Sequence, residues 1–127
     1  MRRVTVVGIV AVLALVAGAV SARVAQPLFP LVSDWQQYFR IDTDSSVADG
    51  RAVVSGKVWN TSSWSGKRIQ LLVEGLDADS QPVTQRVVWL GVNLGSGMHT
   101  YFEVPMPAAA SYRVSVFAFT RGGGRWD

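Results

Sequence analysis

The stretch that decides the fold is RAVVSGKVWN, residues 51–60. Successive side chains of an extended chain point to opposite faces, so this stretch divides into two sets. Val54, Gly56, Val58 and Asn60 share one face, and Val53, Ser55, Lys57 and Trp59 share the other. A small and apolar face opposite a mixed polar face is typical of a strand that is buried on one side. We therefore expect the Val54 face to point into a core.

Five other segments of the chain have a similar strand-like composition. They span residues 37–43, 68–77, 83–92, 99–104 and 111–120. Turn residues cluster between them, notably at residues 45–50, 77–82 and 95–97. No window of residues 23–127 repeats its apolar side chains at a convincing helical period. Short strands at this spacing predict an all-β fold, an immunoglobulin-like antiparallel β-sandwich of about six to seven strands.

The N-terminal segment has a different composition from the rest of the chain. Arg2 and Arg3 precede an apolar run at residues 4–20, and small residues follow at Ser21 and Ala22. This pattern predicts a hydrophobic helix at residues 1–22, as a signal peptide or, alternatively, as an uncleaved membrane anchor. Either interpretation places the remainder outside the cytoplasm, where it is periplasmic or secreted, or held at the inner membrane.

The expected domain organisation follows from these segments. After residues 1–22 we expect a linker or lead-in at residues 23–36, because it carries two prolines and no periodicity. The sandwich should span residues 37–120. A glycine-rich tail, residues 121–127, should be flexible.

Charge and cysteine content exclude several classes of function. The chain carries 12 basic and 9 acidic residues, and Arg2 and Arg3 account for most of its net charge of +3. The remaining domain is nearly balanced, so it lacks the basic footprint of a nucleic-acid-binding protein. The chain contains no cysteine, which excludes a disulfide framework and a thiolate metal site.

Two stretches resemble a known family. They are VSGKVWNTS at residues 54–62 and RIQLLVEGLDADSQPV at residues 68–83. The pattern resembles the FxLYD-type domains, small immunoglobulin-like sandwiches found mainly on exported bacterial proteins. The resemblance covers most of residues 38–118, with Ser80 standing where those domains usually have glycine. It implies the fold but no activity, since domains of this type have no established chemistry, so it transfers no catalytic residues.

The sequence offers no catalytic constellation, and we expect neither an enzyme nor a cofactor or metal site. His99 is the only histidine, and no serine elbow motif accompanies it. Among the glutamates, Glu74 and Glu103 lie within predicted strands, opposite apolar neighbours. We expect both carboxylates to face outward into solvent.

The best candidates for binding are Trp59 and Trp64, together with Lys57. Trp59 and Lys57 share the outward face of their strand, and Trp64 follows in a short polar loop. Exposed tryptophans stack on sugar rings or anchor partner proteins. The alternative is that both rings only cover neighbouring strands.

Asn60, Asp77 and Asp79 are expected to organise turns. Asn60-Thr61-Ser62 fits the glycosylation rule, but an asparagine that ends a strand also bonds its own loop, and we favour this structural role. Asp77 and Asp79 lie in a turn where carboxylates could contribute to a calcium site. The favoured alternative is a turn in which the Asp77 side chain accepts backbone N–H groups.

Together these features predict an exported, non-enzymatic binding or structural module of the cell envelope. Its partner would be an envelope protein or a glycan, not a nucleic acid. Contact with the membrane would come only through residues 4–20, if they remain uncleaved. The alternative function is a carbohydrate-binding module that uses Trp59 and Trp64.

Overall fold

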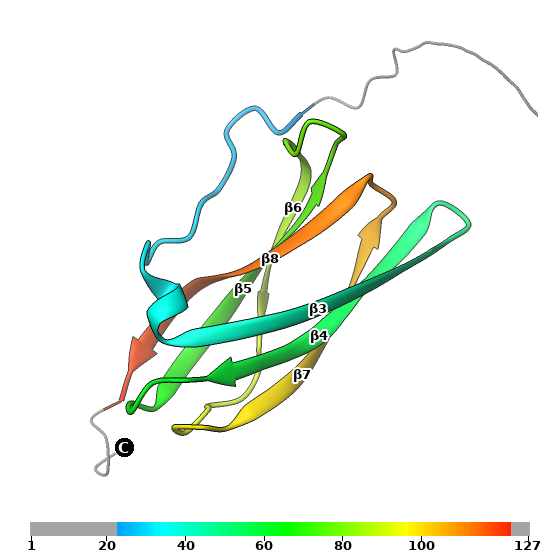
Figure 1. Ribbon diagram of the computed structural model, residues 1–127. Coiled ribbons are helices and arrows are strands. Elements are labelled where there is room, and N and C mark those ends of the chain that lie inside the picture. Colours follow the sequence, from blue (N-terminus) through cyan, green and yellow to red (C-terminus); the bar gives the residue numbers. More distant parts are fainter. Residues whose placement is uncertain (1–22, 123–127) are drawn as a thin grey trace, which may run out of the picture.

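The structure of the protein is a computed structural model that describes residues 23–122 (Figure 1). The hydrophobic helix expected at residues 1–22 and most of the expected tail lie outside the described residues. Within residues 23–122 no helix is long and apolar enough to cross a membrane. The described elements are a short 3-10 helix and six strands: η1 (Trp35–Gln37), β3 (Phe39–Ala48), β4 (Arg51–Asn60), β5 (Gly66–Leu76), β6 (Pro82–Trp89), β7 (His99–Pro107) and β8 (Ser111–Arg121).

The strands form two antiparallel sheets of three strands each. The first sheet has the order β3-β4-β7, and the second has the order β6-β5-β8. Figure 1 shows the two sheets as separate layers, with β4 at the centre of one and β5 at the centre of the other. The all-β, antiparallel two-layer fold predicted from the alternation is therefore confirmed.

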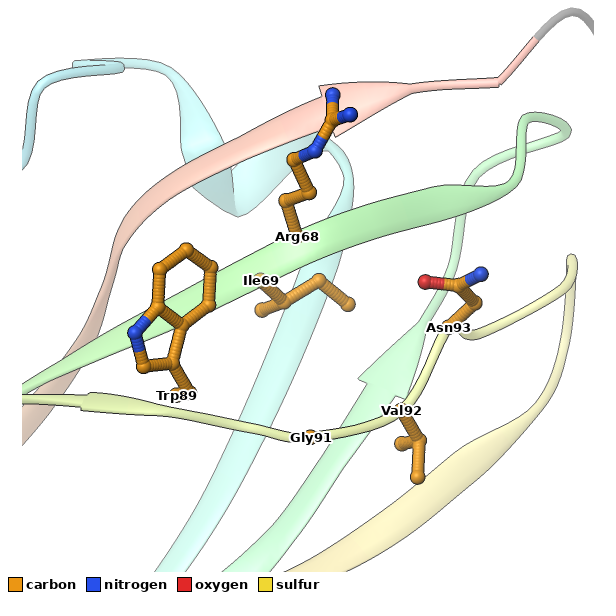
Figure 2. A pocket seen from close by; sticks show the side chains of 6 residues that line it. All are labelled: Arg68, Ile69, Trp89, Gly91, Val92 and Asn93. Carbon is orange, nitrogen blue, oxygen red and sulfur yellow. The ribbon is translucent and has the colours of Figure 1, made fainter.

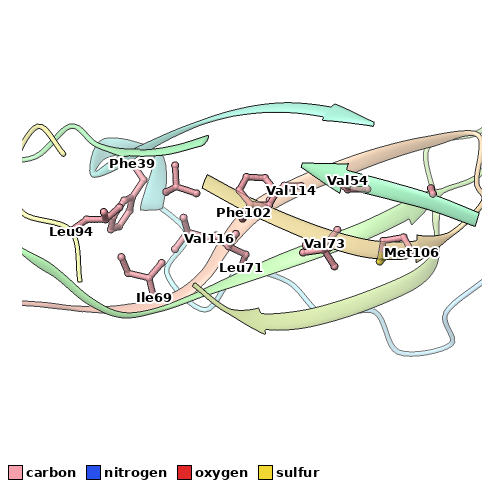
Figure 3. Close-up of a cluster of buried hydrophobic side chains, with 13 residues drawn as sticks. Phe39, Val54, Ile69, Leu71, Val73, Leu94, Phe102, Met106, Val114 and Val116 are labelled. Atoms are coloured by element: carbon pink, nitrogen blue, oxygen red, sulfur yellow. The ribbon is translucent and has the colours of Figure 1, made fainter. Parts of the chain in front are cut away.

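The core lies between the two sheets, and side chains from both inner faces fill it (Figure 3). Val54 and Val58 of β4 are fully buried, as their strand phase predicts. The buried apolar cluster consists of Phe39, Ala52, Val54, Val58, Ile69, Leu71, Val73, Leu94, Phe102, Val104, Met106, Val114 and Val116. Burial of this continuous apolar surface is what holds a domain without disulfides together.

Several strand boundaries differ from the prediction. The segment expected as a loop at residues 45–50 continues β3, which pairs with β4 as far as Ala48 and Arg51. Asp49 and Gly50, with φ of 55° and 75°, close a two-residue hairpin. Pairing with β4 therefore overrides the low strand propensity of the polar residues before the turn. Elsewhere, β6 ends at Trp89 instead of residue 92, and β7 continues to Pro107 instead of ending at residue 104.

Residues 23–36 lie against the second sheet, and we call them the N-terminal strap. The backbone N–H of Val24 donates to the carbonyl of Pro82 at 2.9 Å, and that of Leu31 donates to the carbonyl of Phe117 at 2.8 Å. Pro82 begins β6 and Phe117 lies in β8, so the strap crosses the sheet from one edge strand to the other. The segment expected as a linker or lead-in is thus attached to the domain.

The side chain of Gln85 attaches the middle of the strap. It accepts the Leu28 N–H at 2.8 Å and donates to the Leu28 carbonyl at 3.0 Å, as a neighbouring strand would. The same side-chain amide donates to a carboxylate oxygen of Glu74 at 3.0 Å. Gln85 therefore links the strap to the central strand β5.

Glu74 corrects a prediction, because its side chain is buried instead of solvated. It lies on the outer face of β5, as its phase requires, but only 3% of the residue is exposed. Arg113 of β8 holds the carboxylate with two hydrogen bonds of 2.9 and 3.0 Å. This contact raises the pKa of the Arg113 guanidinium. Alternation predicted the correct face of β5 for Glu74. It could not predict that the strap would pack beside the Glu74 side chain.

Candidate ligand-binding surface

The outer face of the first sheet brings together several aromatic and basic side chains. Antiparallel register places Arg40 of β3 and His99 of β7 on either side of Trp59, and it places Tyr101 directly beside Lys57. Paired residues of neighbouring strands project from the same face of a sheet. These five residues, Arg40, Lys57, Trp59, His99 and Tyr101, are called the Trp59 cluster below.

The Trp59 ring is flanked on both sides and is partly buried. The His99 ring lies 4.2 Å away between centroids at an angle of 31°, and Arg40 Cζ lies 4.8 Å from the indole centroid. Lys57 Nζ lies 5.7 Å from the same ring. Since Arg40 and His99 come from opposite neighbouring strands, the flat faces of the indole are occupied by protein groups. A sugar would have to displace one of them to stack on Trp59.

Tyr101 is the open aromatic ring of the cluster. It is 68% exposed, and Lys57 Nζ lies 5.1 Å from its centroid. Its only described ring contact within residues 23–122 is an edge contact with His99 at 6.3 Å. Tyr101 is not among the binding residues predicted from the sequence. Its exposure could have been predicted, because strand alternation places Tyr101 and Glu103 on the face opposite the buried Phe102 and Val104.

Trp64 belongs to a different part of the surface. It is 40% exposed, and Arg121 Cζ lies 4.9 Å from its ring. The same guanidinium lies 5.7 Å from the Tyr38 ring. In the part of the chain that the structure describes, no ring contact joins Trp64 to Trp59. Of the three predicted binding residues, the structure thus brings together Trp59 and Lys57 and places Trp64 apart from them.

Asn60 organises the corner after β4. Its Nδ2 donates to the carbonyls of Trp64 and Leu94 at 2.7 and 2.8 Å. Its Oδ1 accepts the backbone N–H and the hydroxyl of Ser62 at 2.9 and 2.7 Å. The residue is 1% exposed. In the folded domain, the amide that a glycan would modify is therefore buried and fully bonded.

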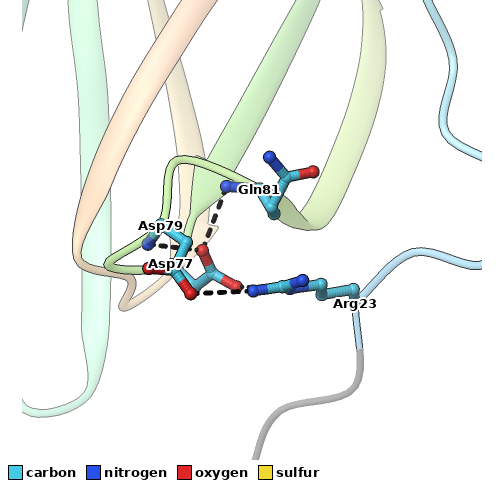
Figure 4. A network of polar contacts seen from close by, with 4 residues as sticks. All are labelled: Arg23, Asp77, Asp79 and Gln81. Atoms are coloured by element: carbon cyan, nitrogen blue, oxygen red, sulfur yellow. Dashed lines mark hydrogen bonds and ion pairs between the residues drawn. The ribbon is translucent and has the colours of Figure 1, made fainter.

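Asp77 and Asp79 form a bonded turn with the start of the strap (Figure 4). Asp77 Oδ1 accepts the backbone N–H groups of Asp79 and Gln81 at 2.9 and 3.0 Å. Arg23 pairs with Asp77 at 2.8 Å and with Asp79 at 3.0 Å. The Gln81 N–H, followed by Arg23, lowers the pKa of the Asp77 carboxyl from its ordinary value. Both carboxylates already have protein partners in this turn.

A groove runs between the edges of the two sheets, where β6 lies opposite β7. One part, of about 300 Å³, is lined by residues 88–90 of β6 and its following loop and by residues 101–105 of β7. An adjoining part, of about 450 Å³, shares Arg86 and Pro105 with the first. Arg86 Nη1 crosses the groove and donates to the Pro105 carbonyl at 2.8 Å.

A further pocket of about 300 Å³ lies at the end of β6 (Figure 2). It is lined by Arg68, Ile69, Trp89, Gly91, Val92 and Asn93. Figure 2 shows the Trp89 indole beside β5, and Trp89 is 65% exposed. Arg68 adopts a positive φ of 49° where the pairing of β5 with β8 is irregular. Arg68 is the only titratable residue in this lining, so the pocket offers no acid–base pair.

No group of three or more His, Cys, Asp or Glu side chains in residues 23–122 could hold a metal ion. We found no match of the chain to a protein-family model, to a curated protein or to a solved structure. The resemblance to FxLYD-type domains therefore stays a prediction.

Proposed function

We propose that this chain is an exported, non-enzymatic binding module of the cell envelope, built on an immunoglobulin-like, FxLYD-type β-sandwich. The observation that carries the proposal is the Trp59 cluster, with the exposed ring of Tyr101 next to Lys57. Exposed tyrosine beside basic groups is typical of surfaces that anchor partner proteins. Because the faces of Trp59 are occupied, a protein partner fits this surface better than a stacked sugar.

The position of the N-terminal strap decides which end of the domain an uncleaved hydrophobic segment would join. Arg23 is bound at the turn after β5, whereas the loop from β4 to β5 lies near the Trp59 cluster, at the opposite end of β5. A strand of this length, Gly66–Leu76, spans roughly 35 Å. An uncleaved hydrophobic segment would therefore join the domain at one end and leave the Trp59 cluster at the other, facing away from the membrane.

Site-specific cross-linking in the cells that make the protein tests this proposal. A photo-reactive phenylalanine analogue replaces Tyr101, and a matched control carries it at Val47, which is exposed on β3 at the other edge of the sheet. We expect a discrete adduct with an envelope protein at position 101 and none at position 47. No adduct above background at position 101 would contradict the proposal. Recovery of the chain only in the cytoplasmic fraction would contradict export.

A carbohydrate-binding module is the second candidate, because the rings of Trp64 and Tyr101 are exposed. Trp64 is 40% exposed and Tyr101 is 68% exposed, and open rings stack on sugars. A glycan array probed with the parent protein and with the Trp59→Ala, Trp64→Ala and Tyr101→Ala variants separates the candidates. Binding that is lost in these variants would favour the carbohydrate function, and an array without any signal would remove it.

A further inference from the structure

The outer edge of β7 carries backbone groups that the first sheet does not use. In an antiparallel pair, alternate residues exchange hydrogen bonds with the partner strand. The Asn60 N–H donates to the Met98 carbonyl at 2.8 Å, just before β7 begins. This bond fixes which residues of β7 form hydrogen bonds with β4. They are Thr100, Phe102 and Val104. The N–H and C=O groups of His99, Tyr101 and Glu103 therefore point away from β4, toward the groove.

The two prolines of β7 agree with this phase. Pro105 and Pro107 pair with Val53 and Arg51 at outward-pointing positions, where β4 requires no N–H donor. Arg86 already occupies the Pro105 carbonyl. The edge is thus closed at its proline end, while residues 99–103 keep both donors and acceptors.

The other three sheet edges each have a backbone group occupied by a described contact, as β7 has at Pro105. On β3, the Asp44 carboxylate accepts the Ser45 N–H at 2.9 Å. On β8 and β6, the strap occupies backbone carbonyls through the N–H groups of Leu31 and Val24. Within residues 23–122, no described contact outside the β4 ladder uses the backbone of Tyr101 or Glu103. Tyr101 and Glu103 also line the groove between β6 and β7, so a strand that pairs with them could bury side chains there.

We propose that residues 99–103 bind an extended segment of a partner protein, which adds to the first sheet as a fourth strand beside β7. The proposal rests on the binding function proposed above and specifies its mode. Backbone pairing would supply affinity, and alternate side chains would supply specificity. Those facing inward would enter the groove lined by Val88, Leu90 and Phe102, so the segment should carry apolar residues at every second position.

Amide hydrogen exchange measured by NMR tests the free edge directly, on the full chain in a mild detergent. In the free protein, the amides of Tyr101 and Glu103 should exchange at least about tenfold faster than those of Phe102 and Val104, whose N–H groups bond β4. Equal protection of the two pairs of amides would show that the edge is already occupied, and it would overturn the inference.

A synthetic peptide of about seven residues, alternating threonine and valine, serves as the probe, since it can extend along the whole of residues 99–103. A fully N-methylated peptide of the same sequence is the control, because it keeps the side chains but has no backbone donors. We expect the first peptide to slow exchange at Tyr101 and Glu103 by at least about tenfold, and the control to have no such effect. No slowing at millimolar peptide would overturn strand addition.

The variants Glu103→Pro and Glu103→Ala separate strand addition from binding by the outer face. Proline removes an outward N–H and leaves the β4 ladder intact, whereas alanine keeps that N–H. Both variants should keep the parental unfolding midpoint, and Glu103→Pro should bind the peptide at least about tenfold more weakly than Glu103→Ala. Equal binding by the two variants, or unfolding of Glu103→Pro, would overturn the assignment of the edge. NMR chemical-shift changes that the peptide causes only at Arg40 and Trp59 would also overturn the assignment of the edge. They would leave the proposed binding function in place.

Discussion

Replacing Asn60 with alanine should destabilise the domain strongly, although the residue touches no candidate ligand. The amide makes four hydrogen bonds, two as a donor to the carbonyls of Trp64 and Leu94 and two as an acceptor from Ser62. An intramolecular hydrogen bond contributes about 1 kcal/mol net, and buried partners left unpaired cost more. The variant should therefore lose about 3–4 kcal/mol of unfolding free energy. Small domains have only about 5–15 kcal/mol in total.

Urea unfolding followed by tryptophan fluorescence measures this loss. With an m-value of about 1–2 kcal/mol per molar, the midpoint should fall by roughly 1.5–4 M. Thr61→Ala is the matched control, because the neighbouring side chain is exposed and makes no described hydrogen bond. It should unfold near the parental midpoint. A loss below about 1 kcal/mol for Asn60→Ala would refute the claim that this amide holds the corner together.

Three further changes test other parts of the structure. Gly56→Ala should lower the unfolding free energy by about 1–3 kcal/mol, because a Cβ there would overlap the Asp42 carbonyl oxygen. An unchanged free energy in urea unfolding would contradict that packing. Ser80→Gly should raise the stability by about 0.5 kcal/mol, since Ser80 adopts a positive φ of 62° that glycine accepts without strain; a lower thermal midpoint would count against it. Hydrogen bonding, with the Gln81 N–H as the largest cause, lowers the pKa of Asp77 below its ordinary 3.8. The unfolded state therefore binds the proton more readily than the folded state. The stability of the domain should fall as the pH drops below about 4. Asp77→Asn should flatten this acid dependence in pH-resolved unfolding, and an unchanged profile would exclude Asp77 as its source.

Strand phase explains which features of the candidate site could be predicted. It placed Trp59 and Lys57 on the outer face and Val54 and Val58 in the core, because alternation is a local property of extended backbone. It did not reveal that His99 stacks on Trp59, since the pairing of β4 with β7 joins residues that are distant in the sequence. Trp64 shows the opposite case, because it is close to Trp59 in the chain but separated from it by the corner at Asn60.

The sequence by itself determined the class of fold, the inward and outward faces of the strands, and the turn chemistry of Asn60 and Asp77. Each of these depends on the side chain and its nearest neighbours along the chain. Only the tertiary structure decided which strands form the edges of the sandwich and which polar groups are buried. Glu74 is buried because Arg113 of a neighbouring strand and Gln85, which also holds the strap, satisfy its carboxylate. Which strands lie at the sheet edges, and which of them border the groove, depends on long-range pairing that leaves no periodic trace in the sequence.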